Sequence, residues 1–132
     1  MTYTTGRKLP AKEIADLREA VGWNRMEEAF TNKNLSNLFE LGCYEGGKLI
    51  GYLNVVSNKV TDAYIQDVMV APEYQRRGIG TELMKRALLR IKEMDIYMVS
   101  VIYGEETLRP FYEKFGFYTM LCGQVETDKV TL

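Results

Sequence analysis

The sequence contains no histidine. Histidine is the commonest general base of enzymes and the commonest zinc ligand, because its ordinary pKa lies close to neutral pH. Any acid–base chemistry must therefore use carboxylates, tyrosine, lysine, cysteine or water. Cysteine is scarce as well: Cys43 and Cys122 are far apart and have no Cys-x-x-Cys spacing, so we expect buried free thiols and no metal site.

The sequence also lacks an excess of charge of either sign, since 17 basic and 18 acidic residues give a net charge of −1. Proteins that bind nucleic acids or membrane surfaces usually carry a basic patch, and none is visible here. No segment is apolar over the length of a membrane span, and the N-terminal residues lack the apolar core of a secretory signal. We therefore expect a cytoplasmic protein whose partners include neither nucleic acid nor membrane.

Hydrophobic periodicity predicts alternating strands and helices within one domain, residues 1–132. Helical spacing indicates helices over residues 11–21, 78–94 and 107–115, with a weaker helix or ordered loop over 23–34. Alternating apolar residues indicate strands over residues 2–5, 38–45, 48–57, 63–70, 97–103 and 117–125, and Gly46-Gly47 indicates a hairpin turn. The predicted buried face of the longest helix consists of Ile79, Leu83, Ala87, Ile91 and Met94. This order predicts an α/β fold with a central mixed, mostly antiparallel sheet flanked by helices.

The most informative segment runs from Val68 to Thr81. An apolar, β-branched stretch leads through a turn with Pro72 into a basic loop with Gly78 and Gly80, which opens an amphipathic helix. The first backbone N–H groups of a helix have no intrahelical acceptor, and the helix dipole places partial positive charge there. Because the two glycines also allow close backbone approach, the segment predicts a main-chain site for the pyrophosphate of a phosphorylated cofactor.

Two common nucleotide motifs do not fit this segment. The dinucleotide fingerprint needs a third glycine at the position of Leu83, and the Walker loop needs a Gly-Lys-Ser/Thr string that is absent. The string Gln75-Arg76-Arg77-Gly78-Ile79-Gly80 instead resembles the acetyl-CoA signature Gln/Arg-x-x-Gly-x-Gly/Ala of the GNAT superfamily of N-acetyltransferases. It also follows a strand that ends in Val-x-Pro-Glu-Tyr, as in that family.

A second string strengthens the resemblance. Phe111-Tyr112-Glu113-Lys114-Phe115-Gly116-Phe117 is similar to the family signature Phe/Leu-Tyr-x-x-x-Gly-Phe and follows the first string at the usual separation. Gly116 is placed to end a short helix, after which Phe117 begins an aromatic strand. The two strings cover the C-terminal half of the chain, whereas the N-terminal half resembles the family only in its order of elements.

The resemblance implies an N-acetyltransferase that moves the acetyl group of acetyl-CoA directly to an amine. It also implies that main chain of the strand pairs with the pantetheine arm and that the loop holds the pyrophosphate. The matching cofactor-binding residues are Val68, Met69, Val70, Gln75, Arg76, Arg77, Gly78, Ile79, Gly80 and Thr81.

Two residues are candidates for catalysis. Tyr112 matches the family's partner for the departing thiolate, and a phenol with an ordinary pKa of about 10 is protonated at neutral pH. The main candidate base is Asp67, which strand alternation places on the same side as Ile65 and Met69. Tyr64, Glu45 and bulk water are weaker alternatives. A carboxylate between apolar neighbours is costly. Asp67 must therefore either have a cationic partner and a structural role, or lie at a hydrated position and take the proton through water.

The chain departs from the family at two positions. Ser100 stands where some relatives have a glutamate base, and Glu105 stands where many have an asparagine that contacts the cofactor arm. Neither function can be carried over to this chain. The candidates for lining an acceptor pocket, each of which core packing explains at least as well, are Trp23, Asn24, Phe30 and Tyr103.

Three functional classes remain open. The first is an N-acetyltransferase for a primary amine of a small molecule, which the short chain and near-neutral charge favour over a protein or peptide amine. The second is an acetyl-CoA-binding sensor with little catalysis, which the missing histidine favours and Tyr112 disfavours. The third, a purely structural domain, leaves Gly78 and Gly80 unexplained. Because the tail after Phe117 is short, a second copy of the chain could complete the last strands, as in a homodimer.

Overall fold

The computed structural model describes the whole chain from Met1 to Leu132. Its contacts divide the chain into two compact units, Met1–Val101 and Ile102–Leu132. The first unit contains the sheet and three α-helices, and the second contains one short α-helix and two 3-10 helices.

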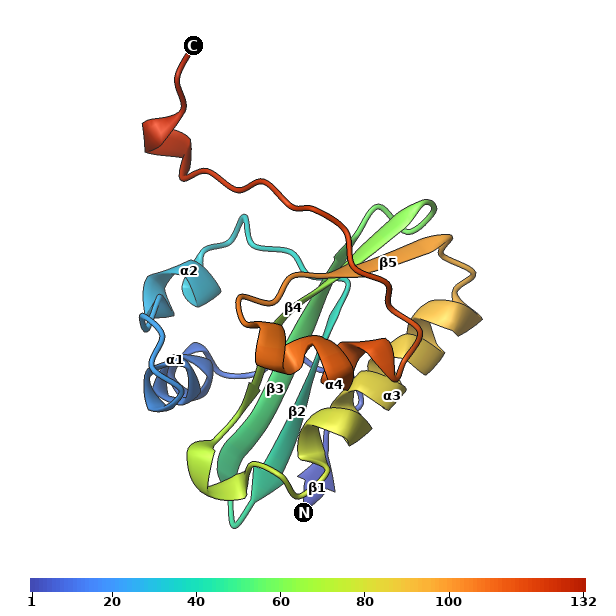
Figure 1. Cartoon of the computed structure of the whole chain (residues 1–132). Coiled ribbons are helices and arrows are strands. Elements are labelled where there is room, and N and C mark those ends of the chain that lie inside the picture. The colour runs from blue at the N-terminus through green and yellow to red at the C-terminus, as the bar shows by residue number, and fades with distance from the viewer. The chain divides into compact units, whose positions relative to one another are not determined.

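A five-stranded sheet forms the centre of the first unit, with its strands side by side in sequence order (Figure 1). The strands are β1 (Thr2–Tyr3), β2 (Phe39–Glu45), β3 (Lys48–Ser57), β4 (Asp62–Val70) and β5 (Met98–Val101). β1 to β4 pair antiparallel, and β5 pairs parallel with β4. The predicted mixed, mostly antiparallel sheet is therefore confirmed.

The β2–β3 hairpin closes through Gly46 and Gly47, whose φ angles are +56° and +78°. A two-residue turn with two positive φ angles matches the twist of the flanking strands, and glycine adopts these angles without strain. The hairpin predicted from the Gly-Gly pair is confirmed.

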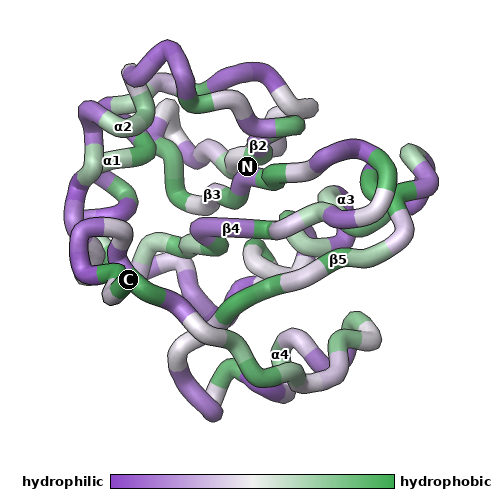
Figure 2. The backbone as a smooth tube through the Cα atoms, turned by 90° about the horizontal axis from the view of Figure 1, so that it is seen from above, coloured by the Kyte–Doolittle hydropathy of each residue, from purple (hydrophilic) through white to green (hydrophobic).

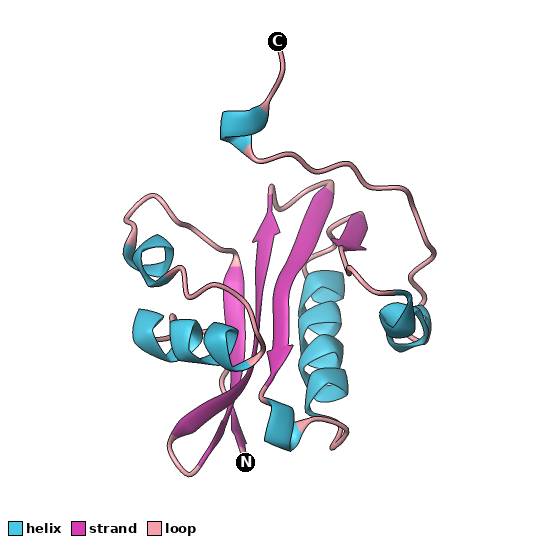
Figure 3. Cartoon of the chain, turned by 60° about the vertical axis from the view of Figure 1, so that its left-hand side comes forward, coloured by secondary structure: helices cyan, strands magenta, loops and turns pink.

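Helices cover both faces of the sheet (Figure 3). α1 (Ala11–Ala20) and α2 (Glu27–Thr31) lie on one face, and α3 (Ile79–Glu93) lies on the other. The second helix is shorter than the expected range of 23–34, and the segment that follows it is largely hydrophilic (Figure 2). None of the helices combines the length and the hydropathy that a membrane crossing requires.

α3 packs its apolar stripe against the sheet through Ile79, Leu83, Met84, Ala87 and Ile91. The expected burial of Met94 is wrong, because the helix ends at Glu93 and Met94 is its exposed C-cap residue. Gly51 of β3 leaves the space that α3 fills. A Cβ atom at Gly51 would lie only 2.8 Å from Cγ2 of Ile79 and 3.1 Å from Cδ1 of Leu83.

The second unit is built around α4 (Arg109–Glu113), which follows the 3-10 helix η2 (Glu106–Leu108). Gly116, with a φ of +99°, follows α4 as predicted for a residue that ends a helix. The strand predicted over residues 117–125 is wrong, because this stretch has no regular structure and no strand pairs with it. Its aromatic and apolar side chains do favour a strand, but such a strand is stable only beside a partner.

The missing strand changes the surroundings of the stretch over residues 117–125. Its exposed large apolar side chains are Tyr118, Met120, Leu121 and Val125. Cys122 is exposed with them, so the expected buried thiol is wrong at this position. Cys43 in β2 is buried and free, as predicted.

The contact between Gly51 and α3 generates a stability prediction. Gly51→Ala should lower the free energy of unfolding by about 1–3 kcal/mol, because the added methyl group overpacks the β3–α3 interface. Urea denaturation measures the change. Gly104→Ala is the matched control, since a Cβ atom at Gly104 meets nothing within 4 Å. Equal midpoints for the Gly51 variant and the wild type would contradict the packing described here.

Candidate functional site

The edge of β4 that faces β5 is open along its C-terminal part. β5 pairs with β4 only from Asp62 to Ile65, and no strand pairs with that edge beyond Ile65. The N–H of Ala71 donates to the carbonyl of Ile50 in β3 at 2.8 Å, so by alternation the backbone groups of Val70 face the open edge. An extended ligand can therefore pair with this edge as an added strand would.

β4 contains a bulge directly before this open edge. Gln66 is opposite Asn54 and Met69 is opposite Tyr52, so two residues of β4 stand against one residue of β3. One of the two is Asp67, whose φ of +54° lies in the left-handed region.

The bulge changes which side chains share a face of the sheet. Ile65 pairs with Val55, and Met69 pairs with Tyr52, so Ile65 and Met69 lie on opposite faces. The prediction that Asp67 shares one face with both of them is therefore wrong, because simple alternation does not allow for an extra residue. Asp67 instead turns to the face that α1 covers, where it meets Arg18.

Asp67 has a cationic partner. Nη1 of Arg18 lies 3.2 Å from Oδ1 of Asp67, and Nδ2 of Asn54 donates to Oδ2 at 3.0 Å. The side chain of Arg18 is 9% exposed and that of Asp67 is 27% exposed, so the pair is largely shielded from water. Arg18 is thus the cationic partner that a structural role of Asp67 requires.

Arg18 also gathers three of the four residues that the sequence suggested for an acceptor pocket. Its Nε donates to the carbonyl of Asn24 at 2.6 Å, and its Nη2 donates to Oδ1 of Asn24 at 2.8 Å. The guanidinium lies 5.4 Å from the ring centroid of Trp23 and 5.9 Å from that of Phe30. The arrangement fixes Arg18 against the sheet and so fixes Asp67.

A chain of buried hydrogen bonds runs from Asp67 across the sheet. Asn54, which donates to Asp67, also donates to the hydroxyl of Tyr52 at 3.3 Å. Tyr52 donates to Oε2 of Glu40 at 2.5 Å, and the N–H of Leu9 donates to Oε1 of Glu40 at 2.5 Å. Burial, followed by the neighbouring Glu40 carboxylate, raises the pKa of Tyr52, so its hydroxyl remains a donor.

Sequence reasoning missed Arg18, Glu40 and Asn54. Arg18 follows Ile14 by four residues, so helical periodicity places it on the buried stripe of α1, and this signal was available. Glu40 and Asn54 alternate with apolar residues and so fit a solvent-facing position in a strand. Because helices cover both faces of this sheet, that face is buried as well.

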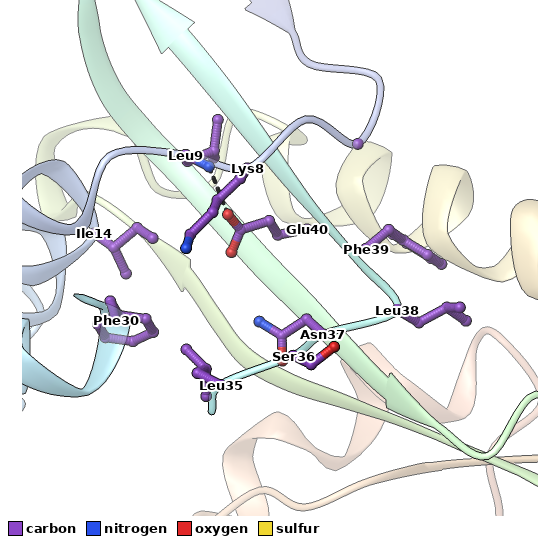
Figure 4. Close-up of a pocket in the computed structure, with 11 residues that line it drawn as sticks. Lys8, Leu9, Ile14, Phe30, Leu35, Ser36, Asn37, Leu38, Phe39 and Glu40 are labelled. Atoms are coloured by element: carbon purple, nitrogen blue, oxygen red, sulfur yellow. Dashed lines mark hydrogen bonds between the residues drawn. The ribbon is translucent and has the colours of Figure 1, made fainter. Parts of the chain in front are cut away.

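Glu40 opens onto a cavity of about 250 Å³ on the α1 side of the sheet (Figure 4). The cavity is lined by Gly6, Lys8, Leu9, Ile14, Phe30, Leu35, Ser36, Asn37, Leu38, Phe39 and Glu40. Phe30, one of the acceptor-pocket candidates, thus lines a real cavity.

The glycine loop continues β4 through the 3-10 helix η1 (Pro72–Tyr74) and enters α3. Arg76 and Gly78 have φ angles of +64° and +85°. The positive φ angle at position 78 explains why a glycine stands there. The side-chain amide of Gln75 donates to the carbonyl of Val70 at 3.0 Å and ties the loop to the open edge. Ile79 is buried in the core, so only its main chain is available to a ligand.

Tyr112 lies in the second unit within an aromatic cluster. Its ring stacks on Tyr103 at 4.8 Å between centroids and meets Phe111 and Phe117 edge-on at 5.0 Å and 6.2 Å. Burial, followed by the neighbouring Tyr103, raises the pKa of Tyr112 to about 12. The phenol therefore keeps its proton at neutral pH and can donate it or a hydrogen bond.

The family model described as "Acetyltransferase (GNAT) family" matches residues 9–117. The chain belongs to this family. The match includes the open β4 edge, the glycine loop and Tyr112, and it confirms the resemblance inferred from the two sequence strings.

Individual relatives agree with this assignment. A protein from Prochlorococcus marinus, named an uncharacterized N-acetyltransferase ycf52-like, is 32% identical over 120 residues, which are 87% of this chain and 66% of that protein. The structure of a GNAT family acetyltransferase from Streptococcus pneumoniae has a TM-score of 0.78 and 28% identity, covering 98% of this chain and 100% of that chain. The family and the fold are thus those of N-acetyltransferases.

A second similar structure contains coenzyme A. It is an aminoglycoside 6'-N-acetyltransferase complexed with coenzyme A, with a TM-score of 0.69 and 16% identity, covering 88% of this chain and 84% of that chain. At this identity the likeness shows the fold alone. This chain spans about half to two thirds of the length of the curated relatives that it matches first.

The ion pair between Arg18 and Asp67 generates a second prediction. Arg18→Met should lower the free energy of unfolding by about 2–4 kcal/mol, because it leaves Asp67 and the acceptors of Asn24 without their shielded donor. Lys12→Met, which removes an exposed ion pair with Asp16 on the same helix, should cost less than about 1 kcal/mol. Thermal denaturation of both variants checks the difference. If Arg18→Met loses no more stability than Lys12→Met, the pair of Arg18 and Asp67 has no structural role.

Proposed function

We propose that the protein is an acetyl-CoA-dependent N-acetyltransferase that acetylates a primary amine, most simply that of a small molecule. The observation that carries the proposal is the open edge of β4, which leads through the glycine loop directly into the start of α3. The edge supplies backbone groups for an extended arm, and the helix start supplies N–H groups for an anion. An acyl-CoA molecule has both of these parts in one chain.

The residues present fit this cofactor. The open edge at Val68 and Val70 is suited to the pantetheine arm, with Met69 between them facing β3. The loop residues suited to the pyrophosphate are Gln75, Arg76, Arg77, Gly78, Ile79, Gly80 and Thr81. When bound, acetyl-CoA supplies the thioester that the amine attacks directly, through a tetrahedral intermediate.

Tyr112 is proposed as the donor to the departing thiolate. Its raised pKa keeps the phenol protonated at neutral pH and up to the ordinary amine pKa of about 10. A group with this role must be protonated when the carbon–sulfur bond breaks, and the buried phenol is protonated. Tyr103, which stacks on the ring, helps to keep the phenol in this protonated state.

Asp67 is proposed to position the site, with proton removal through water as the other role open to it. Both of its oxygens already accept hydrogen bonds, one from Arg18 and one from Asn54. A base must reach the ammonium or a water beside it, and a carboxylate held on both sides is less free to do so. The pair supports positioning, because it holds the bulge at the start of the open edge.

Two alternative functions also require acetyl-CoA binding but differ in the acceptor or in turnover. A peptide or protein amine is the alternative acceptor, which the short chain and its near-neutral charge disfavour. A sensor that binds acetyl-CoA without turnover is disfavoured by the protonated Tyr112. A cytoplasmic location and a homodimer remain predictions of the sequence.

The cofactor assignment predicts the effect of one substitution in α3. Gly80→Val should abolish coenzyme A binding in titration calorimetry, because a branched side chain at the helix start blocks close backbone approach to the pyrophosphate. Leu89→Val is the matched control, since it introduces the same side chain at an exposed position of the same helix. Arg76→Ala should weaken binding only slightly, because an exposed charge contributes little. Unaltered affinity in Gly80→Val would place the cofactor elsewhere.

The role of Tyr112 predicts a loss of turnover without a loss of binding. Tyr112→Phe should lower kcat by about 10²–10⁴-fold and leave the affinity for coenzyme A unchanged, because only the hydroxyl is removed. In the wild type, the rate should rise with pH as the acceptor ammonium loses its proton. Because the pKa of Tyr112 is raised, its ionisation should cause no fall in rate below about pH 10. Tyr97→Phe, which removes the hydroxyl of an exposed tyrosine, serves as the control. Normal turnover in Tyr112→Phe would show that the residue only packs.

A further inference from the structure

β5 is the last strand of the sheet, and no strand pairs with the edge that faces away from β4 (Figure 1). The N–H of Met98 donates to the carbonyl of Thr61 at 2.8 Å, so by alternation the backbone groups of Val99 and Val101 face this free edge. Proteins usually protect such an edge with charged side chains or proline. The run from Ile96 to Tyr103 contains neither, so the edge is open to pairing with a further strand.

The same chain contains a strand-forming segment without a partner. We call residues Tyr118–Val125 the tail segment; it has no charged residue, and its aromatic and β-branched side chains favour a strand. Every one of its residues is exposed, Leu121 fully, and no strand pairs with it in its own chain. Its start is anchored, because the ring of Phe117 meets that of Tyr112 edge-on. Apolar surface exposed in this way marks a site of protein interaction.

The free edge of β5 suits the tail segment better than the open edge of β4. The edge of β4 is open only beyond Ile65, and the bulge at Asp67 interrupts it there. The carbonyl of Val70 on that edge already accepts a hydrogen bond from Gln75. β5, by contrast, is regular from Met98 to Val101 and uncharged, so pairing it with the uncharged tail segment buries no unpaired charge.

A second copy of the chain is the partner that both features fit. Each copy carries one free β5 edge and one unpaired tail segment. A reciprocal exchange therefore pairs both segments and both edges at once, in a closed assembly with two-fold symmetry. A partner of any other sequence that covers the edge leaves the tail segment exposed.

We propose that two copies form a dimer in which the tail segment of each pairs, as an added strand, with the free edge of β5 of the other. The inference goes beyond the proposed function and does not depend on it, because neither surface contains a residue assigned to the cofactor or to catalysis. It also specifies which surfaces form the homodimer that the sequence predicted.

Sedimentation equilibrium over a series of protein concentrations tests the dimer. Met120→Pro and Leu121→Pro each remove one backbone N–H, and because neighbouring residues of a strand face opposite edges, one of the two lies in the new ladder. That variant loses two hydrogen bonds per dimer, so its dissociation constant should rise roughly ten-fold or more. Circular dichroism confirms that each variant is folded.

Thr131→Pro is the matched control for the two proline variants. It lies beyond the tail segment at an exposed position, and Val130 before it is already extended, as a residue that precedes proline must be. Its dissociation constant should equal that of the wild type. A wild type that stays monomeric over the whole series, or a dimer that neither variant in the tail segment weakens, would overturn the proposal.

Cross-linking between two different copies identifies the surfaces. One copy carries Ser100→Cys, at an exposed position of β5, together with Cys122→Ser; the other is the wild type with its exposed Cys122. A bismaleimide with a spacer of about 8 Å tolerates a register offset of about two residues and should join the copies into a mixed covalent dimer. Ser36→Cys in place of Ser100→Cys, exposed in the loop before β2, should give little of it. Equal yields from both positions would contradict the pairing with β5.

A chain with both thiols separates exchange from pairing within one copy. Ser100→Cys with the native Cys122 should give covalent dimers in an amount that falls on dilution. A link within one monomer that persists on dilution would overturn the proposal and assign the tail segment to its own β5. Because these experiments use neither acetyl-CoA nor an amine, their failure would leave the proposed function standing.

Discussion

The β-bulge in β4 places one extra residue opposite β3. Asp67 accommodates this extra residue by adopting a φ of +54°. A residue other than glycine in this region costs about 1–3 kcal/mol and persists only where its surroundings hold it, although aspartate tolerates it better than most. Here the surroundings are Arg18 from α1 and Asn54 from β3. The bulge turns the strand at the point where β5 ends, so the direction of the open edge depends on this one held residue.

The buried polar chain links this point to the far side of the sheet. Because Asn54, Tyr52 and Glu40 each depend on the next for a hydrogen bond, a change at one of them leaves a neighbour unsatisfied in a low-dielectric interior. Because any other packing would leave some of these buried groups without a hydrogen bond, we expect few alternative packings on the α1 face. The same chain makes the cavity at Glu40 and the bulge at Asp67 parts of one rigid arrangement.

Most elements and the glycine loop could be predicted from the sequence, because local signals specify them: Gly46-Gly47 for the hairpin, the stripe from Ile79 to Ile91 for α3, and Gly78 for the loop. The bulge could not, since nothing in an alternating pattern marks an extra residue. The polar chain was missed for a related reason: it occupies a face that alternation assigns to solvent. The last predicted strand failed because propensity describes one chain segment, whereas a strand is a property of a pair.

The open edge of β4 has a consequence beyond ligand binding. Unpaired backbone N–H and C=O groups on a strand are a template for any other extended chain, and proteins usually protect such edges. Here the carbonyl of Val70 accepts a hydrogen bond from the side-chain amide of Gln75. No strand pairs with the rest of this edge beyond Ile65. A molecule that occupies the edge would therefore act against self-association as well as shift the folding equilibrium, by about 2.7 kcal/mol at a hundred times its Kd. For this fold, the concentration of such a ligand therefore affects both the fraction of the protein that is folded and the access of other extended chains to the edge.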